Sequence, residues 1–195
     1  VSLALLKDTE PLLGAMYYPN LNIMLSAERE QGTWLNDRKI ILPPTLHYAP
    51  EHPIRISGSI GEMSKDWTAK TVKSIHTGSL CLTFLSLLST AIQKFSTDLP
   101  ECFAYIGGNT PAYDLGAGPL MWTEAGGVIL DVDGKKISPY DKTYTDESGD
   151  VRISVIYLMA PTDEYGKKLL EYLTPSAILS PQTRVTKATA RSKKK

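Results

Sequence analysis

The segment from Tyr113 to Gly127 (YDLGAGPLMWTEAGG) holds the residues of this chain that are best suited to chemistry. Asp114 stands directly before a predicted helix whose first turns consist of small residues, and Gly126-Gly127 predicts a left-handed C-cap at its end. A carboxylate beside the N–H groups of a helix start suits a cation together with a phosphate, and its hard oxygen ligands favour Mg²⁺. The segment therefore predicts a magnesium and phosphate site at Asp114.

Two local readings of these candidate residues stay open. Asp is a favoured helix N-cap residue, so Asp114 taken alone is more typical of a cap than of a metal ligand. Gly78-Ser79 precedes another predicted helix, and no Gly-x-Ser-x-Gly pattern surrounds Ser79 to mark it as a nucleophile. We expect Ser79 to be an N-cap whose neighbouring backbone N–H groups face a ligand, and His76 to be bonded to backbone rather than to act as an acid.

The composition predicts one soluble globular domain with a sizeable core, because 42% of the residues are hydrophobic and 22% are charged. The 21 Lys and Arg balance the 21 Asp and Glu, which argues against nucleic-acid or membrane binding. The basic tail over 179–195 is expected to be disordered and solubilising, since it lacks aromatic residues for base stacking.

Cys81 and Cys102 match no disulfide framework or zinc motif, so we expect reduced thiols and a cytoplasmic location. No apolar run reaches the length of a membrane span.

These residues need elements to position them, and residues 1–44 are expected to form an antiparallel meander. Alternating apolar residues and turn signals predict strands over 1–7, 12–18, 23–27, 33–35 and 39–41. A proline-rich connector over 42–53 leads into a C-terminal α/β domain over 45–178. There we expect strands over 54–60, 71–75, 102–106, 128–131 and 151–160, and helices over 62–68, 79–95, after Asp114 and over 162–173. Strands that alternate with helices indicate a layered α/β (α+β) fold.

The motifs resemble those of the inositol monophosphatase family. Tyr113 to Gly127 matches the family's Trp-Asp-x-Ala-Ala/Gly … Glu-Ala-Gly-Gly signature, with Tyr in place of Trp. His76 to Leu80 is similar to the family's Gly-Ser/Thr-Ala segment at the start of a helix, and Glu10 to Gly14, Pro19 and Gly32 to Asn36 follow its meander pattern. The similarity runs in order from Val1 to about Leu173, nearly the whole chain.

The resemblance implies a magnesium-dependent, lithium-sensitive phosphomonoesterase built from alternating layers of helices and sheets. It implies that Asp114 is a metal ligand rather than a mere cap, and that Gly78, Ser79 and Leu80 contact the substrate, a small phosphorylated metabolite. The implied chemistry is in-line attack of a metal-activated water on phosphorus. The family often forms homodimers, so a homodimer is one expectation for this chain.

The sequence departs from the family in its acidic residues. The family's other metal ligands come from a Glu-Glu segment and an Asp-Pro-x-Asp-Gly-Thr loop that precede the strand beginning here at Val1, and neither occurs in this sequence. We therefore expect a C-terminal portion of the fold, with the N-terminal part missing, that is inactive alone. Many inositol-hydrolysing members place a glutamate seven residues before the signature aspartate, where this chain has Gly107. That departure argues against inositol phosphate, which is the default substrate by family name. A 3′(2′),5′-bisphosphate nucleotide, a sugar bisphosphate and histidinol phosphate are the open alternatives.

Two further expectations follow from the missing segments. The alternative function is a non-catalytic interaction module derived from the same fold, which the absent ligands and Gly107 favour and the intact Asp114 opposes. A meander without neighbouring strands would leave an open apolar edge, which predicts poor solubility or self-association of the isolated chain. Glu30 replaces a glycine that is usual in the family's meander, so we expect an altered turn there.

Overall fold

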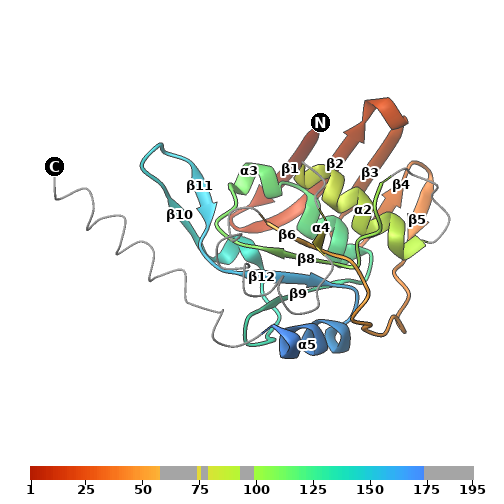
Figure 1. Ribbon diagram of the computed structural model, residues 1–195. Helices are drawn as coiled ribbons and strands as arrows, with labels where there is room; N and C mark the ends of the chain where they lie inside the picture. The colour runs from red at the N-terminus through yellow and green to blue at the C-terminus, as the bar shows by residue number, and fades with distance from the viewer. Residues whose placement is uncertain (58–73, 76–78, 93–98, 174–195) are drawn as a thin grey trace, which may run out of the picture.

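A computed structural model describes residues 1–57, 74–75, 79–92 and 99–173 of the chain. The predicted helix over 62–68, the ends of the elements predicted over 54–60, 71–75 and 79–95, and the basic tail lie outside the described residues. Within these ranges the fold is a stack of helix and sheet layers (Figure 1), as the sequence predicted.

The N-terminal sheet, sheet A, is the predicted antiparallel meander with strand order β1-β2-β3-β4-β5. Its strands are β1 (Ser2–Lys7), β2 (Glu10–Tyr18), β3 (Ile23–Glu28), β4 (Gly32–Leu35) and β5 (Arg38–Ile40). The 3-10 turn η1 (Pro19–Leu21) separates β2 from β3, because Pro19 cannot donate to the sheet and Asn22 adopts a left-handed φ of 51°. The inner face of sheet A is buried, with Met16 and Leu25 both fully inaccessible.

The second sheet, sheet B, is mixed, with strand order β7-β6-β8-β12-β9. Strands β6 (Ile54–Ile56), β7 (Ser74–Ile75) and β8 (Ala104–Gly107) run parallel, and β12 (Tyr157–Ala160) pairs antiparallel with β8 and with β9 (Val128–Asp131). The prediction of one strand over 151–160 is wrong. β11 (Val151–Ile153) instead pairs with β10 (Thr143–Thr145) as a separate hairpin, and the chain crosses to sheet B only afterwards.

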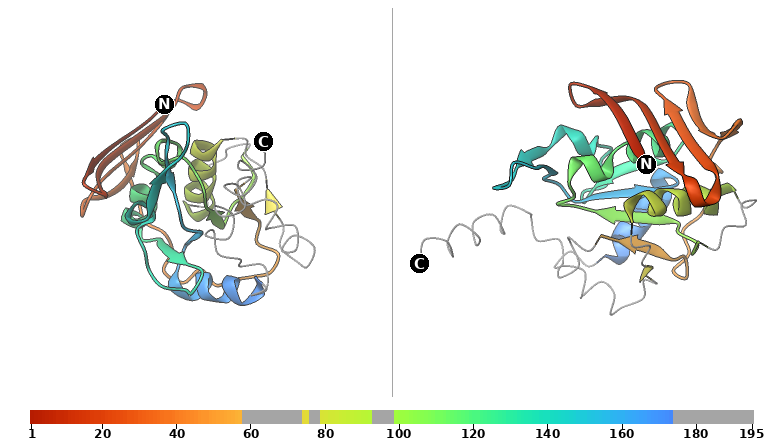
Figure 2. Two further views of the ribbon diagram at one scale, coloured as in Figure 1. Left: turned by 90° about the vertical axis from the view of Figure 1, so that its left-hand side faces the viewer. Right: turned by 90° about the horizontal axis from the view of Figure 1, so that it is seen from above.

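Helices fill the space between the sheets and cover the far side of sheet B (Figure 2). Helices α2 (Leu80–Ile92), α3 (Ala112–Leu115) and α4 (Gly118–Glu124) lie between the sheets, while α5 (Asp163–Tyr172) covers the other face of sheet B. One core joins sheet A, α2, α4 and one face of sheet B, and a second joins sheet B to α5. α5 begins as predicted, with the Thr162 hydroxyl accepting a hydrogen bond from the Tyr165 amide at 3.1 Å.

Among the described helices, none is both long and apolar enough to cross a bilayer.

The remaining short element, the 3-10 turn η3 (Pro139–Asp141), follows the turn after β9 and brings Tyr140 into the core. Its hydroxyl donates a hydrogen bond to the Gly116 carbonyl, so η3 helps to position the segment that carries Asp114.

Candidate functional site

Asp114 lies within the short helix α3 and not, as predicted, directly before a long helix. Pro111 occupies the N-cap position, so the interpretation of Asp114 as an N-cap is wrong. The helix stops after one turn because Gly116 takes a φ of 50°, and a second helix, α4, begins at Gly118. The predicted helix is therefore two helices, with the carboxylate on the first.

The Asp114 side chain is exposed, while the helix that carries it packs against the core. Leu115, the next residue, is fully buried. Within the described part of the chain, no hydrogen bond or ion pair engages the Asp114 carboxylate. Helix α3 contacts α2 and strand β11, so both elements fix its position. A carboxylate held on an anchored turn and left unpaired is available to a ligand.

The small residues of the signature allow three elements to approach one another closely. A Cβ added to Gly118 would lie 1.9 Å from the Phe84 ring of α2. A Cβ added to Gly14 of β2 would lie 2.5 Å from the Cβ of Ala117. Helix α4 thus packs tightly between α2 and sheet A. Larger side chains at Gly118 or Gly14 would not fit there. This close packing sets the position of α3 relative to both.

Glu124 has a structural role that sequence reasoning missed. Its two carboxylate oxygens accept hydrogen bonds from the backbone N–H groups of Glu30 and Gly32, each at 2.9 Å. These amides belong to the turn between β3 and β4, where Glu30 has a left-handed φ of 65°. The buried Thr33 hydroxyl adds a 2.6 Å hydrogen bond to the Met121 carbonyl. Glu124, the acid of the Glu-Ala-Gly-Gly segment, therefore ties α4 to the β3–β4 turn of the meander, which is far from it in sequence.

Replacing Glu124 by alanine is expected to lower the free energy of unfolding by about 2–4 kcal/mol, because two amides lose a charged acceptor. Glu124→Gln keeps one acceptor oxygen and should lose roughly half as much. Glu147→Ala, at an exposed site in the β10–β11 hairpin, is the control, with an expected change within about 0.5 kcal/mol. Urea unfolding followed by circular dichroism measures all three. An alanine variant as stable as the control would show that the two bonds do not hold the turn.

The predicted C-cap at Gly126-Gly127 is confirmed. Gly126 has a φ of 102°, its N–H donates to the Thr123 carbonyl at 2.9 Å, and the Gly127 N–H donates to the Trp122 carbonyl at 3.0 Å. This is the bonding pattern of a Schellman motif. It ends α4 and turns the chain into β9, as the sequence predicted.

Of the predicted substrate contacts, Gly78 lies outside the described residues. Ser79 immediately precedes α2, and its carbonyl accepts hydrogen bonds from the Thr83 amide and hydroxyl, both at 3.0 Å. Leu80 is the first residue of α2 and is half-buried. Helix α2 contacts both α3 and α4. The Ser79 turn, at the start of α2, and Asp114, in α3, therefore belong to neighbouring helices.

Gly107 ends β8 directly opposite Tyr157 of β12. A Cβ at Gly107 would lie 2.4 Å from the Tyr157 ring and 2.8 Å from that of Tyr105. Tyr157 is fully buried, and burial raises the pKa of its phenol well above the ordinary value. A glutamate at position 107 would therefore require Tyr157 to move, because aromatic side chains fill the space beside Gly107.

The described residues do not form a complete magnesium centre. No group of three or more Asp, Glu, His or Cys side chains gathers anywhere in those ranges. Mg²⁺ requires near-octahedral oxygen coordination, to which one exposed carboxylate contributes a single position. Asp114 fits the role of one ligand, and the remaining positions are not filled by the described part of the chain.

The fold and the signature define a layered α/β protein with an exposed carboxylate on a short helix, α3, that is anchored by α2 and β11. A family model described as the inositol monophosphatase family matches residues 1–166. The chain belongs to this family.

Three relatives illustrate the match. A fructose-1,6-bisphosphatase/inositol-1-monophosphatase of Thermotoga maritima is 24% identical over 156 residues, covering 80% of this chain and 58% of the relative. Inositol monophosphatase 2 of Saccharomyces cerevisiae is 28% identical over 136 residues, covering 66% and 47%. The solved structure of an IMPase/NADP phosphatase complexed with Mg²⁺ and phosphate aligns with a TM-score of 0.60 and 17% identity, covering 88% of this chain and 57% of that one. The fold is thus shared, and the chain spans about half the length of the curated relatives it matches.

Proposed function

We propose that this chain contributes Asp114 and the Ser79 turn to the active site of a magnesium-dependent enzyme that hydrolyses a small phosphate monoester. The observation that carries the proposal is the Asp114 carboxylate, exposed and unpaired on an anchored turn beside α2. The family membership and the names of the relatives, which are phosphatases, support the reaction class. Mg²⁺ bound at such a site would activate water and neutralise phosphate charge.

The residues of the chain have separate roles in this proposal. Asp114 holds one coordination position, and the backbone N–H groups at the start of α2 favour a negatively charged phosphate. Gly107, packed against Tyr157, offers no carboxylate to a substrate hydroxyl. This favours a bisphosphate nucleotide, a sugar bisphosphate or histidinol phosphate over an inositol phosphate. Cys81 and Cys102 are not joined in a disulfide, which supports a cytoplasmic location for the enzyme.

The 195-residue chain is expected to release no phosphate above background from these esters with Mg²⁺. One carboxylate cannot hold a magnesium centre that polarises both water and phosphate. Phosphate release at rates typical of an enzyme, measured with a colorimetric assay, would overturn this expectation.

Metal binding tests Asp114 without requiring turnover. Mn²⁺ added together with inorganic phosphate should broaden the NMR signals of residues 112–116 before those of other exposed acids. Asp114→Asn should remove this broadening, and the matched control Asp133→Asn, in the exposed turn after β9, should leave it unchanged. Broadening that begins elsewhere, or that persists in Asp114→Asn, contradicts the assignment.

The second candidate is a non-catalytic interaction module built on the same fold. The absence of an acidic cluster in the described ranges favours it. In that case Mn²⁺ and phosphate would show no preference for residues 112–116, so the same titration separates the two candidates.

A further inference from the structure

The β10–β11 hairpin stands out from the body of the molecule beside α3 (Figure 1). Each of its strands has only 3 residues, and an isolated two-stranded hairpin is at best marginally stable in water. The hairpin therefore depends on its contacts with the body. At its base Ile153 is fully buried, and β11 contacts α3. The hairpin and the helix that carries Asp114 are thus packed together.

Two hairpin side chains bond Asn109, which lies in the short loop over 108–111 between β8 and α3. The Arg152 guanidinium donates to the Asn109 carbonyl at 3.2 Å, and the Tyr144 hydroxyl donates to the Asn109 side-chain oxygen at 2.5 Å. Asn109 has a left-handed φ of 51°, a conformation that most side chains disfavour and that Asn tolerates. The two bonds hold the loop in this conformation.

The same loop leads directly into the helical turn that carries Asp114. The Ile153 amide donates to the Thr110 carbonyl at 2.9 Å. Pro111 follows as the N-cap of α3, and its carbonyl accepts hydrogen bonds from the amides of Asp114 at 3.1 Å and Leu115 at 3.2 Å. Because α3 is a single turn built on Pro111, a shift of the loop also shifts the Asp114 carboxylate.

Asp146, at the tip of the hairpin, orients the Arg152 side chain. Asp146 accepts hydrogen bonds from the amides of Ser148 at 2.9 Å and Asp150 at 3.1 Å, and it forms an ion pair with Arg152. The planar guanidinium has several N–H donors in a fixed geometry, so its Nε bonds Asp146 while its Nη1 bonds the Asn109 carbonyl. Arg152 therefore links the tip of the hairpin to the loop.

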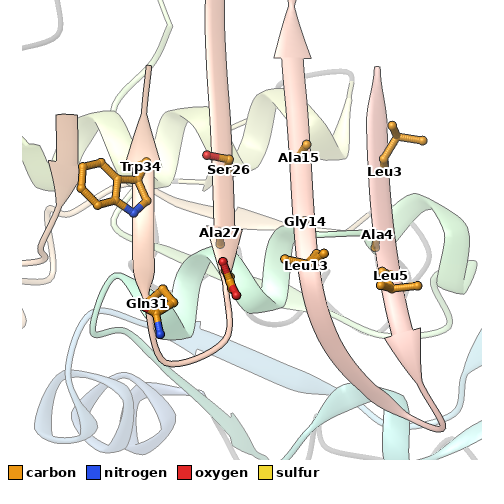
Figure 3. Close-up of a pocket in the computed structure, with 11 residues that line it drawn as sticks. Leu3, Ala4, Leu5, Leu13, Gly14, Ala15, Ser26, Ala27, Gln31 and Trp34 are labelled. Atoms are coloured by element: carbon orange, nitrogen blue, oxygen red, sulfur yellow. The ribbon is translucent and has the colours of Figure 1, made fainter. Parts of the chain in front are cut away.

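Sheet A, by contrast, fixes the neighbouring helix α4. Gly14 of β2 approaches Ala117, the residue before α4. A trough of about 430 Å³ on the outer face of sheet A is lined by residues between Leu3 and Trp34, and by none of α3 or the 108–111 loop (Figure 3). The hairpin, and not sheet A, supplies the side chains that bond Asn109.

We propose that Arg152 and Tyr144 are positioning residues that, by holding Asn109, fix α3 and with it the Asp114 carboxylate. Groups that support a metal ligand from behind set its orientation and its affinity for the metal. The consequence for metal binding rests on the proposed role of Asp114 as a ligand, whereas the fixing of α3 does not.

Amide hydrogen exchange, measured by NMR on the full 195-residue chain without metal, tests the positioning itself. Tyr144→Phe removes only a hydroxyl, and Arg152→Lys keeps the charge beside Asp146 but loses the planar fork. In each variant the Leu115 amide should exchange at least about threefold faster, because the loop loses a bond. Tyr172→Phe, which removes a hydroxyl from a 52% exposed ring of α5, is the matched control and should leave this exchange unchanged.

Mn²⁺ added with inorganic phosphate tests the consequence for the site. The apparent Mn²⁺ dissociation constant, from the broadening of residues 112–116, should rise at least about threefold in Tyr144→Phe and in Arg152→Lys. The midpoint of urea unfolding should stay close to that of the parent. Asn109→Gly keeps the left-handed φ but removes the acceptor, so combining it with Tyr144→Phe should weaken Mn²⁺ binding no further than Asn109→Gly alone.

The two measurements separate this inference from the proposed function. Unchanged exchange of the Leu115 amide in both hairpin variants overturns the inference, even where Mn²⁺ binds at residues 112–116. Faster exchange in Tyr172→Phe as well, or an Mn²⁺ affinity that stays constant while exchange accelerates, also overturns it. Faster exchange in the hairpin variants alone, with no broadening at 112–116 in the parent, supports the hairpin's hold on α3 and shows that only the metal role of Asp114 is wrong.

Discussion

Trp122→Ala is expected to lower the free energy of unfolding by about 3–5 kcal/mol. The Trp122 ring is 1% exposed, and its Nε1–H donates to the carbonyls of Val128 and Ala160, both at 3.1 Å. Truncation removes a large buried volume and leaves two carbonyls of sheet B without this donor. Trp122 therefore joins α4 to two strands, β9 and β12, at one point.

The conservative variant separates packing from hydrogen bonding. Trp122→Phe keeps most of the ring but loses the donor, and should lower the free energy of unfolding by about 1–3 kcal/mol. Tyr113→Ala, at a position 64% exposed, is the aromatic control and should stay within about 0.5 kcal/mol of the parent. Thermal and urea unfolding give the values. A phenylalanine variant as stable as the parent would show that the two hydrogen bonds contribute nothing.

Gly118→Ala is expected to destabilise the protein by about 1–3 kcal/mol or more, although alanine is the better helix former. The new Cβ would lie 1.9 Å from the Phe84 ring, a separation that either α2 or α4 must relieve by moving. Because α4 is joined to α3, this movement also displaces Asp114. Urea unfolding measures the loss, and the NMR shifts of residues 112–116 report the displacement.

Two comparisons make the Gly118 result specific. Gly166→Ala in α5 places its Cβ 2.6 Å from the Cδ1 of Leu130, the end of a flexible side chain that can rotate away, so its loss should be smaller. Adding Phe84→Leu to Gly118→Ala should recover part of the stability, because the two changes act on one contact. Strictly additive losses in the double variant would rule out the Phe84 clash as the cause.

Local patterns predicted the meander, the Gly126-Gly127 cap and the start of α5. Each depends on residues close in sequence: alternation along a strand, a glycine with positive φ after a helix, or a Thr162 hydroxyl three residues before an amide. The family was also visible in the sequence, because its signature is a contiguous segment.

Long-range contacts decided the rest. The break between α3 and α4 requires the positive φ of Gly116, whose carbonyl accepts a hydrogen bond from Tyr140 in a distant 3-10 turn. Residues 151–160 divide into β11 and β12 because the first half pairs with β10, whereas the second half pairs with strands of sheet B. Propensity alone cannot encode such choices, because they are settled by the packing of segments far apart in sequence.

By itself the sequence determined that this is a layered α/β member of the inositol monophosphatase family and that Asp114 is its most informative acid. Only the tertiary structure decided that Asp114 is exposed on a separate turn, that Glu124 serves the β3–β4 turn, and that Gly107 is required by Tyr157. The physical reason is that residue type sets which interactions a side chain can make. Whether a carboxylate meets solvent or two backbone amides depends on which distant segments the fold places beside it.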